Sequence, residues 1–94
     1  MAVIVTMQVG PVDWSKFQAA LDWGRDKPAP GRKSSNIYRS QGDPSQVLIV
    51  EEWDSHDAMH RYQDQVGDEF NRRAGTEGMD WQSGVWEQAG SLQA

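Results

Sequence analysis

The chain has 94 residues, a formal net charge of −5 and no cysteine. This length gives one domain, 1–94, and the negative charge disfavours nucleic acid as a partner because phosphates would be repelled. The lack of cysteine excludes disulfides and thiolate chemistry. The apolar stretch at residues 2–5 is too short for a signal peptide or a membrane span, so we expect a cytoplasmic protein with no membrane partner.

The first two elements have clear periods. Residues 2–9 are mostly β-branched and apolar, which predicts a strand. After a Gly10-Pro11 turn, Asp13 is a candidate N-cap for a helix. The apolar face of this helix is predicted to consist of Trp14, Phe17 and Leu21.

A hairpin is predicted in the middle of the chain. Residues 34–41 form a weaker strand pattern and residues 46–53 the strongest one. The short connection at residues 42–44, Gly-Asp-Pro, makes the two strands antiparallel neighbours. Within the second strand, the apolar run at residues 47–50 is typical of a strand covered on both faces.

A second helix and a last strand complete the pattern. Asp54 or Ser55 can cap the helix, and Gly67 is expected to weaken it and to kink or split it. Residues 80–89 predict the last strand. The inward face of the helix is predicted to be Met59, Tyr62, Val66 and Phe70.

The predicted order of elements, β-α-β-β-α-β, defines an α+β fold of the ferredoxin-like type. Its four-stranded antiparallel sheet carries both helices on one face because crossovers are right-handed. Leu48 and Val50 would then project from the opposite face, where a single chain leaves them in water. We therefore expect a homodimer that packs through this sheet face and forms a dimeric α+β barrel.

Several stretches resemble the antibiotic biosynthesis monooxygenase (ABM) family. They are Ala29-Pro-Gly, Ile37-Tyr-Arg-Ser, Asp43-Pro, Val47-Leu-Ile-Val-Glu-Glu-Trp-Asp-Ser and Val85-Trp-Glu. The resemblance implies a homodimeric barrel with a pocket between sheet and helices in each subunit. It also implies the activities found among its members, which include cofactor-free oxygenation of aromatic polyketides and quinols, and haem degradation. Many members have no assigned activity.

Two branches of the family match this chain unequally. The haem-degrading branch has a His ligand late in the second helical region, but no His follows His60 here, so we expect no haem. Trp53 matches a pocket Trp of a polyketide-oxidising branch. Where that branch has Asn and Tyr, this chain has Ile49 and Met59.

The predicted site combines polar groups with an apolar pocket. Oxygenation without metal or flavin needs a substrate anion, a group that takes its proton, and donors for the developing oxyanion. The catalytic candidates are Glu51 as a partly desolvated base, Trp53 as an indole donor and stacking wall, and His60 as a base at the pocket edge. The candidates for binding an aromatic or apolar substrate are Tyr62, Tyr38, Met59, Ile49 and Trp14.

Structural roles compete with these functional ones. Trp53 and Tyr62 fit core packing, and Glu51 fits a structural hydrogen bond equally well. His56, His60 and Asp64 form one helical row, which we interpret as solvent-exposed rather than as a metal site. We predict a cofactor-independent monooxygenase of small electron-rich aromatics, quinols or polyketide-like molecules, without metal or cofactor. The alternatives are a non-catalytic binding or stress-response module and a structural dimer whose pocket is filled by its own aromatics.

Overall fold

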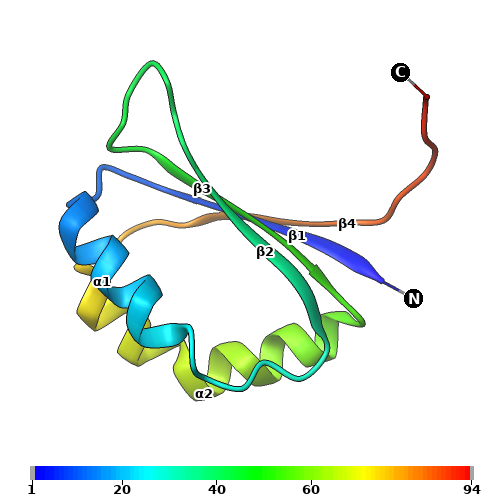
Figure 1. Ribbon diagram of the computed structural model, residues 1–94, viewed down its shortest axis with the longest axis horizontal. Coiled ribbons are helices and arrows are strands. Elements are labelled where there is room, and N and C mark those ends of the chain that lie inside the picture. Colours follow the sequence, from blue (N-terminus) through cyan, green and yellow to red (C-terminus); the bar gives the residue numbers. More distant parts are fainter. Residues whose placement is uncertain (1, 94) are drawn as a thin grey trace.

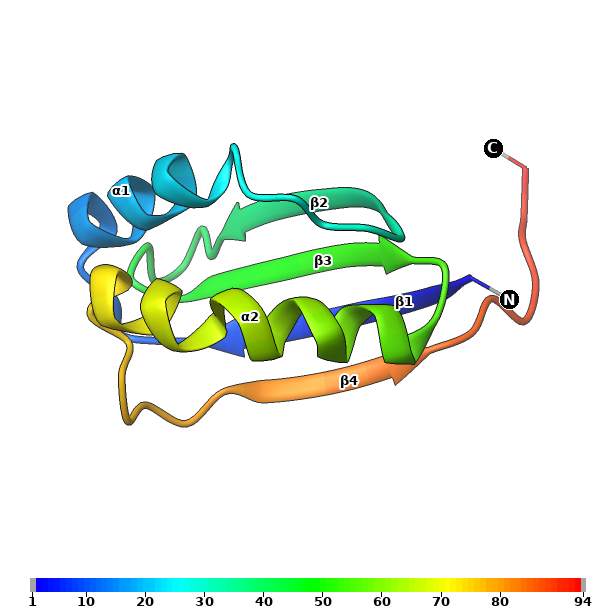
Figure 2. The ribbon, with the colours of Figure 1, turned by 90° about the horizontal axis from the view of Figure 1, so that it is seen from below.

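The computed structural model describes residues 2–93. The elements are β1 (Val3–Val9), α1 (Trp14–Gly24), β2 (Arg32–Arg39), β3 (Val47–Trp53), α2 (His56–Ala74) and β4 (Gln82–Trp86). The strands form one antiparallel sheet in the order β2-β3-β1-β4, and both helices cover the same face of it (Figure 1 and Figure 2). The predicted ferredoxin-like α+β fold is confirmed. No helix within residues 2–93 has both the length and the apolar character needed to cross a membrane.

The helix-facing side of the sheet carries the core. One cluster lies beneath α1 and the end of α2, and the other lies beneath the start of α2. Phe17 links the two helices, because its ring meets the Phe70 ring edge-on with centroids 5.5 Å apart. The buried members of the two clusters are Val9, Phe17, Ala20, Val47, Ile49 and Ala74, and Val5, Trp53, Ala58 and Met59.

The helix ends follow from local hydrogen bonding. The Asp13 carboxylate accepts from the backbone N–H groups of Ser15 and Lys16, which confirms this N-cap. Of the two candidates for α2, Ser55 is the cap, because its hydroxyl accepts from the Ala58 N–H. Gly67 does not split α2, since one continuous helix spans His56–Ala74. Caps and tertiary packing outweigh the cost of one helical glycine, about 1 kcal/mol.

In the hairpin of β2 and β3, paired residues lie at equal distances along the chain from Asp43. Ile37 pairs with Ile49, and Ser35 pairs with Glu51. The Asp43 carboxylate accepts hydrogen bonds from the hydroxyl and the N–H of Ser45, and these bonds lower the pKa of Asp43. This closed turn fixes which side chains of the two strands lie side by side.

The hairpin departs from regular pairing at its open end. Arg32 pairs with Trp53 and Ser34 pairs with Glu52, so that Lys33 is an extra residue on β2. The strand begins two residues before the predicted boundary at Ser34 because this bulge continues the pairing. A bulge re-aims the side chains next to it. Arg32 consequently lies on the helix-facing side with Ser35, and Lys33 is exposed beside Asp54.

The opposite face of the sheet is uncovered in the single chain. Leu48 is 36% exposed and Trp86 is 59% exposed. The Trp86 indole lies across Gly84, and its N–H donates to the Thr6 hydroxyl at 2.9 Å. The sequence prediction that Leu48 projects away from the helices agrees with this placement.

Gly31→Ala should destabilise the fold. Gly31 has φ of 93°, and an added Cβ would lie 2.9 Å from the Ala58 Cβ at the start of α2. The expected loss is about 1–3 kcal/mol of unfolding free energy, measured by urea denaturation. Gly24→Ala is the control, because nothing lies within 4 Å of a Cβ there. Equal midpoints for the two variants would contradict this packing.

Candidate functional site

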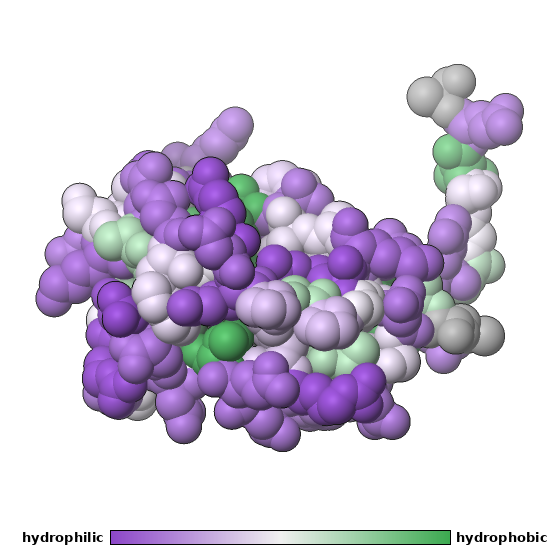
Figure 3. Space-filling model, turned by 60° about the horizontal axis from the view of Figure 1, so that its bottom comes forward, coloured by the Kyte–Doolittle hydropathy of each residue, from purple (hydrophilic) through white to green (hydrophobic). Residues whose placement is uncertain are grey.

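A cavity lies between the sheet and the two helices. Its volume is about 580 Å³, within the range of about 300–1,000 Å³ that is typical of small-molecule sites. The aromatic residues of the chain therefore do not fill this space. The helix side of the molecule is largely hydrophilic, with a hydrophobic area among the polar atoms (Figure 3). Apolar lining residues are Met7, Ile49, Val66, Phe70 and Trp81.

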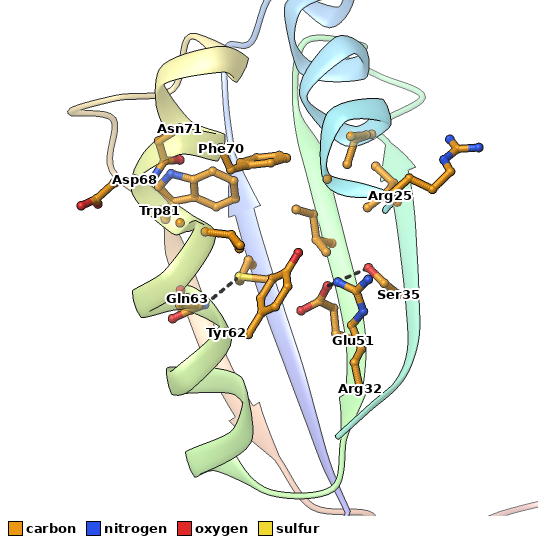
Figure 4. Close-up of a pocket in the computed structure, with 18 residues that line it drawn as sticks. Arg25, Arg32, Ser35, Glu51, Tyr62, Gln63, Asp68, Phe70, Asn71 and Trp81 are labelled. Atoms are coloured by element: carbon orange, nitrogen blue, oxygen red, sulfur yellow. Dashed lines mark hydrogen bonds and ion pairs between the residues drawn. The ribbon is translucent and has the colours of Figure 1, made fainter. Parts of the chain in front are cut away.

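Glu51 is the most constrained polar group of the cavity wall (Figure 4). The side chain is 8% exposed. Its Oε1 accepts from the Trp53 indole N–H at 3.0 Å, and its Oε2 accepts from the Ser35 hydroxyl at 2.7 Å. The Arg32 Nη1 lies 3.5 Å from the same Oε2. Three partners thus hold a carboxylate in one orientation, as burial of a charge requires.

Trp53 has a different place from the one predicted. It is completely buried and does not line the cavity. Its ring packs at a tilt against Tyr62, with centroids 5.4 Å apart, and its N–H is committed to Glu51. In this arrangement Trp53 orients the carboxylate rather than contacting a ligand.

Two predicted binding residues reach the cavity and one lies beneath it. Tyr62 lines the wall from α2, and its hydroxyl points into the space between this helix and the sheet (Figure 4). Ile49 forms part of the floor from β3. Met59 is buried against Trp53 in the core and does not line the cavity.

Three other candidates lie away from the cavity. His60 is exposed, because it follows the inward-pointing Met59 by about 100° around the helix. Tyr38 is 53% exposed on the uncovered face of the sheet, since it alternates with the inward-facing Ile37. Trp14 stacks on Phe17 in the core beneath the guanidinium of Arg39.

The histidine row has no metal-binding geometry. His56 and His60 are both exposed, and their ring centroids lie 4.2 Å apart. Across residues 2–93, no group of three or more His, Cys, Asp and Glu side chains is placed to hold a metal ion.

The site residues that sequence reasoning missed include Ser35, Arg32 and Trp81. Ser35 was predictable in principle, because it and Glu51 are equidistant from the turn at Asp43. Arg32 carried no signal, because regular alternation places Lys33 rather than Arg32 on the inner face. Trp81 lines the cavity, and its buried indole N–H has no hydrogen-bond partner among the described residues.

A ferredoxin-like α+β domain with a pocket between its sheet and its helices defines the structural class of this protein. The family model for antibiotic biosynthesis monooxygenases matches residues 1–76, and the chain belongs to this family. Comparison with curated proteins found no match.

Solved structures of the same fold are similar over nearly the whole chain. SnoaB, a cofactor-independent oxygenase from Streptomyces nogalater, has a TM-score of 0.73 at 16% identity, covering 99% of this chain and 97% of its own. The ActVA-Orf6 monooxygenase of Streptomyces coelicolor, in complex with nanaomycin D, has a TM-score of 0.71 at 14% identity. The match covers 99% of this chain and 92% of the other. Rv0793 from Mycobacterium tuberculosis has a TM-score of 0.72 at 14% identity, and the match covers 99% of this chain and 100% of the other. At these identities the similarity shows the fold.

Trp53→Phe should destabilise the protein mainly through Glu51. The change leaves a buried carboxylate oxygen without its indole donor, which costs about 1.5–3 kcal/mol of unfolding free energy. In a Glu51→Met background this hydrogen bond is already absent, so the same change should cost less by roughly 1–2 kcal/mol. Urea denaturation of the wild type, the two single variants and the double variant, all at the same protein concentration, measures this difference. An equal cost in both backgrounds would show that the indole contributes only by packing.

Proposed function

We propose that this protein is a cofactor-independent monooxygenase of small electron-rich aromatic, quinol or polyketide-like molecules. The observation that carries the proposal is a buried carboxylate in the wall of a ligand-sized cavity, in a chain of the ABM family. Two of the structurally similar proteins, SnoaB and ActVA-Orf6, are themselves described as an oxygenase and a monooxygenase. Their activities support the proposal through the shared fold.

Glu51 acts as the general base in this proposal. It takes a proton from an acidic ring methylene or hydroxyl, and the resulting substrate anion supplies the electrons that reduce O₂. For a ring methylene, one oxygen atom of O₂ enters the product as a carbonyl. The other oxygen leaves as water with both methylene hydrogens, so atoms and electrons balance. Trp53 and Ser35 position the base through their hydrogen bonds to it.

The remaining walls suit an uncharged ring system. Ile49, Met7 and Phe70 present apolar surface from β3, β1 and α2. Exclusion of water around the ring strengthens the interactions of the polar groups with the developing charge. The Tyr62 hydroxyl, which points into the same space, is a neutral donor available to a substrate oxygen.

Oxygen consumption with a panel of anthrones and hydroquinones tests this function. The wild-type protein should exceed the uncatalysed rate with at least one member. Glu51→Gln should lower that rate by about 10²-fold or more, because it keeps the shape and removes the base. Glu77→Gln, the same change at an exposed position outside the cavity, should leave the rate unchanged. No oxygen consumption with any member, or an equal rate in Glu51→Gln, would refute the proposed mechanism.

A non-catalytic binding protein is the second candidate. It is favoured by one observation, the commitment of the Trp53 N–H to Glu51 rather than to the cavity. In this second function, the carboxylate and its three partners have the structural role of shaping the pocket. This function predicts saturable binding of the same aromatics with no oxygen consumption.

We propose in addition that the uncovered sheet face packs against a second copy, which completes a dimeric barrel. Leu48 and Trp86 are the apolar groups that a partner would cover. Leu48→Asp should convert a dimer into a monomer in sedimentation velocity, because it places a charge in that interface. Gln65→Asp adds the same charge at an exposed position of α2 and should leave the dimer intact. If the Leu48→Asp protein still sediments as a dimer, the uncovered sheet face is not the dimer interface.

A further inference from the structure

We propose that Arg32 makes the cavity selective for ligands with an acidic oxygen, either a carboxylate or an ionised phenol or enol. The guanidinium would bind this oxygen at the β2 side of the cavity, next to Glu51. The inference rests on the proposed function of the same cavity and names the substrate class within it.

The bulge at Lys33 brings Arg32 into the cavity. In a regular hairpin Lys33 would pair with Trp53 and face the helices, but the bulge gives that pairing to Arg32. Lys33 is instead exposed, with its Nζ 3.7 Å from the Asp54 carboxylate. The inner position thus carries a guanidinium, whose planar donors match a carboxylate or phenolate better than an ammonium does.

The surroundings of Arg32 hold its head group in place. The side chain is only 24% exposed. Its guanidinium carbon lies 5.1 Å from the ring centre of Tyr62 and 5.9 Å from that of Trp53. Figure 4 shows the side chain reaching up beside Glu51, opposite Tyr62. Two aromatic faces and one carboxylate therefore orient a cation at the cavity wall.

The hydrogen-bonding capacities of Arg32 and Glu51 are unequally used. Glu51 accepts from Trp53 and Ser35 in addition to its ion pair. Arg32 has five N–H donors, yet its side chain makes no hydrogen bond within residues 2–93 and its ion-pair distance is 3.5 Å. The group with unused hydrogen-bonding capacity is a donor, so the complementary ligand atom is an acceptor. Because this donor is a cation, an acceptor with negative charge binds it more strongly than a neutral one.

Arg32 is also the better placed of the two cations that line the cavity. Arg25 lines it too, but its side chain is 74% exposed and its guanidinium binds the Asp22 carboxylate at 2.9 Å. The protein as a whole has a net charge of −5, which repels anions at long range. Selectivity for an acidic ligand must therefore come from short-range contacts inside the cavity, where Arg32 lies.

Binding of a matched ligand pair tests the inference. The probes are 2-naphthoate and 2-naphthamide, which share one ring system and nearly one shape but differ in charge. Isothermal titration calorimetry should give the wild-type protein about tenfold or greater preference for the carboxylate, as expected for hydrogen bonds to a charged group. Arg32→Gln should abolish this preference mainly by weakening the binding of the carboxylate.

Two further variants separate the role of Arg32 from general charge effects. Lys33→Gln removes the same charge from the neighbouring residue outside the cavity, and it should keep the wild-type preference. Arg32→Lys should restore part of the preference, because it returns the charge without the planar donors. Circular dichroism spectra of all variants show whether each has the native fold.

The outcomes distinguish this inference from the proposed function. Equal affinities of the wild-type protein for the two probes, or an unchanged preference in Arg32→Gln, would overturn the role of Arg32 while oxygenase activity could still be observed. Carboxylate preference without oxygen consumption on any substrate would support the anion site and refute the oxygenase. Failure of both probes to bind at millimolar concentration would overturn the anion site.

Discussion

The pairing of β2 with β3 positions the polar side of the cavity. Its symmetric turn at Asp43 sets Ser35 beside Glu51, and the bulge at Lys33 turns Arg32 inward at the open end. Trp53, the last residue of β3, contributes its indole N–H from the same sheet face. A shift of β2 by one residue in this register would direct Ser35 to the opposite face and leave Glu51 without its partner on the neighbouring strand. The fold and the candidate chemistry therefore depend on one set of backbone hydrogen bonds.

The carboxylate of Glu51 connects stability with function. A buried charge persists only with partners that replace water, and three side chains from β2 and β3 supply them. The same partners restrict its orientation, which a positioned base requires. Trp53 belongs to this support rather than to the contact surface, because the indole is completely buried. Family membership supplies the expectation of oxygenation, and the Glu51 cluster supplies a specific residue with which to test it.

The sheet divides the molecule into two unequal surfaces. The helix-covered face holds the core and the cavity, whereas Leu48, Tyr38 and Trp86 lie on the uncovered face. The chain is small, and chains of this size bury a limited share of their surface. A second copy on the uncovered face would add burial without altering the cavity on the other side. In the proposed dimer, the interface and the cavity would therefore lie on opposite faces of the sheet.

Residue patterns were sufficient to predict the order of the elements, the hairpin turn, the Asp13 cap and the inward placement of Glu51 and Tyr62. Those features follow from periodicity and local hydrogen bonding, which are properties of neighbouring residues. Three features became known from the folded chain: α2 continues through Gly67, Trp53 donates to Glu51, and Arg32 rather than Lys33 reaches the cavity. The continuous helix and the bulge depend on packing or pairing between separate segments of the chain. The Trp53 indole and Glu51 are neighbours on one strand, but the indole is held in place by its packing against Tyr62 and Met59 of α2.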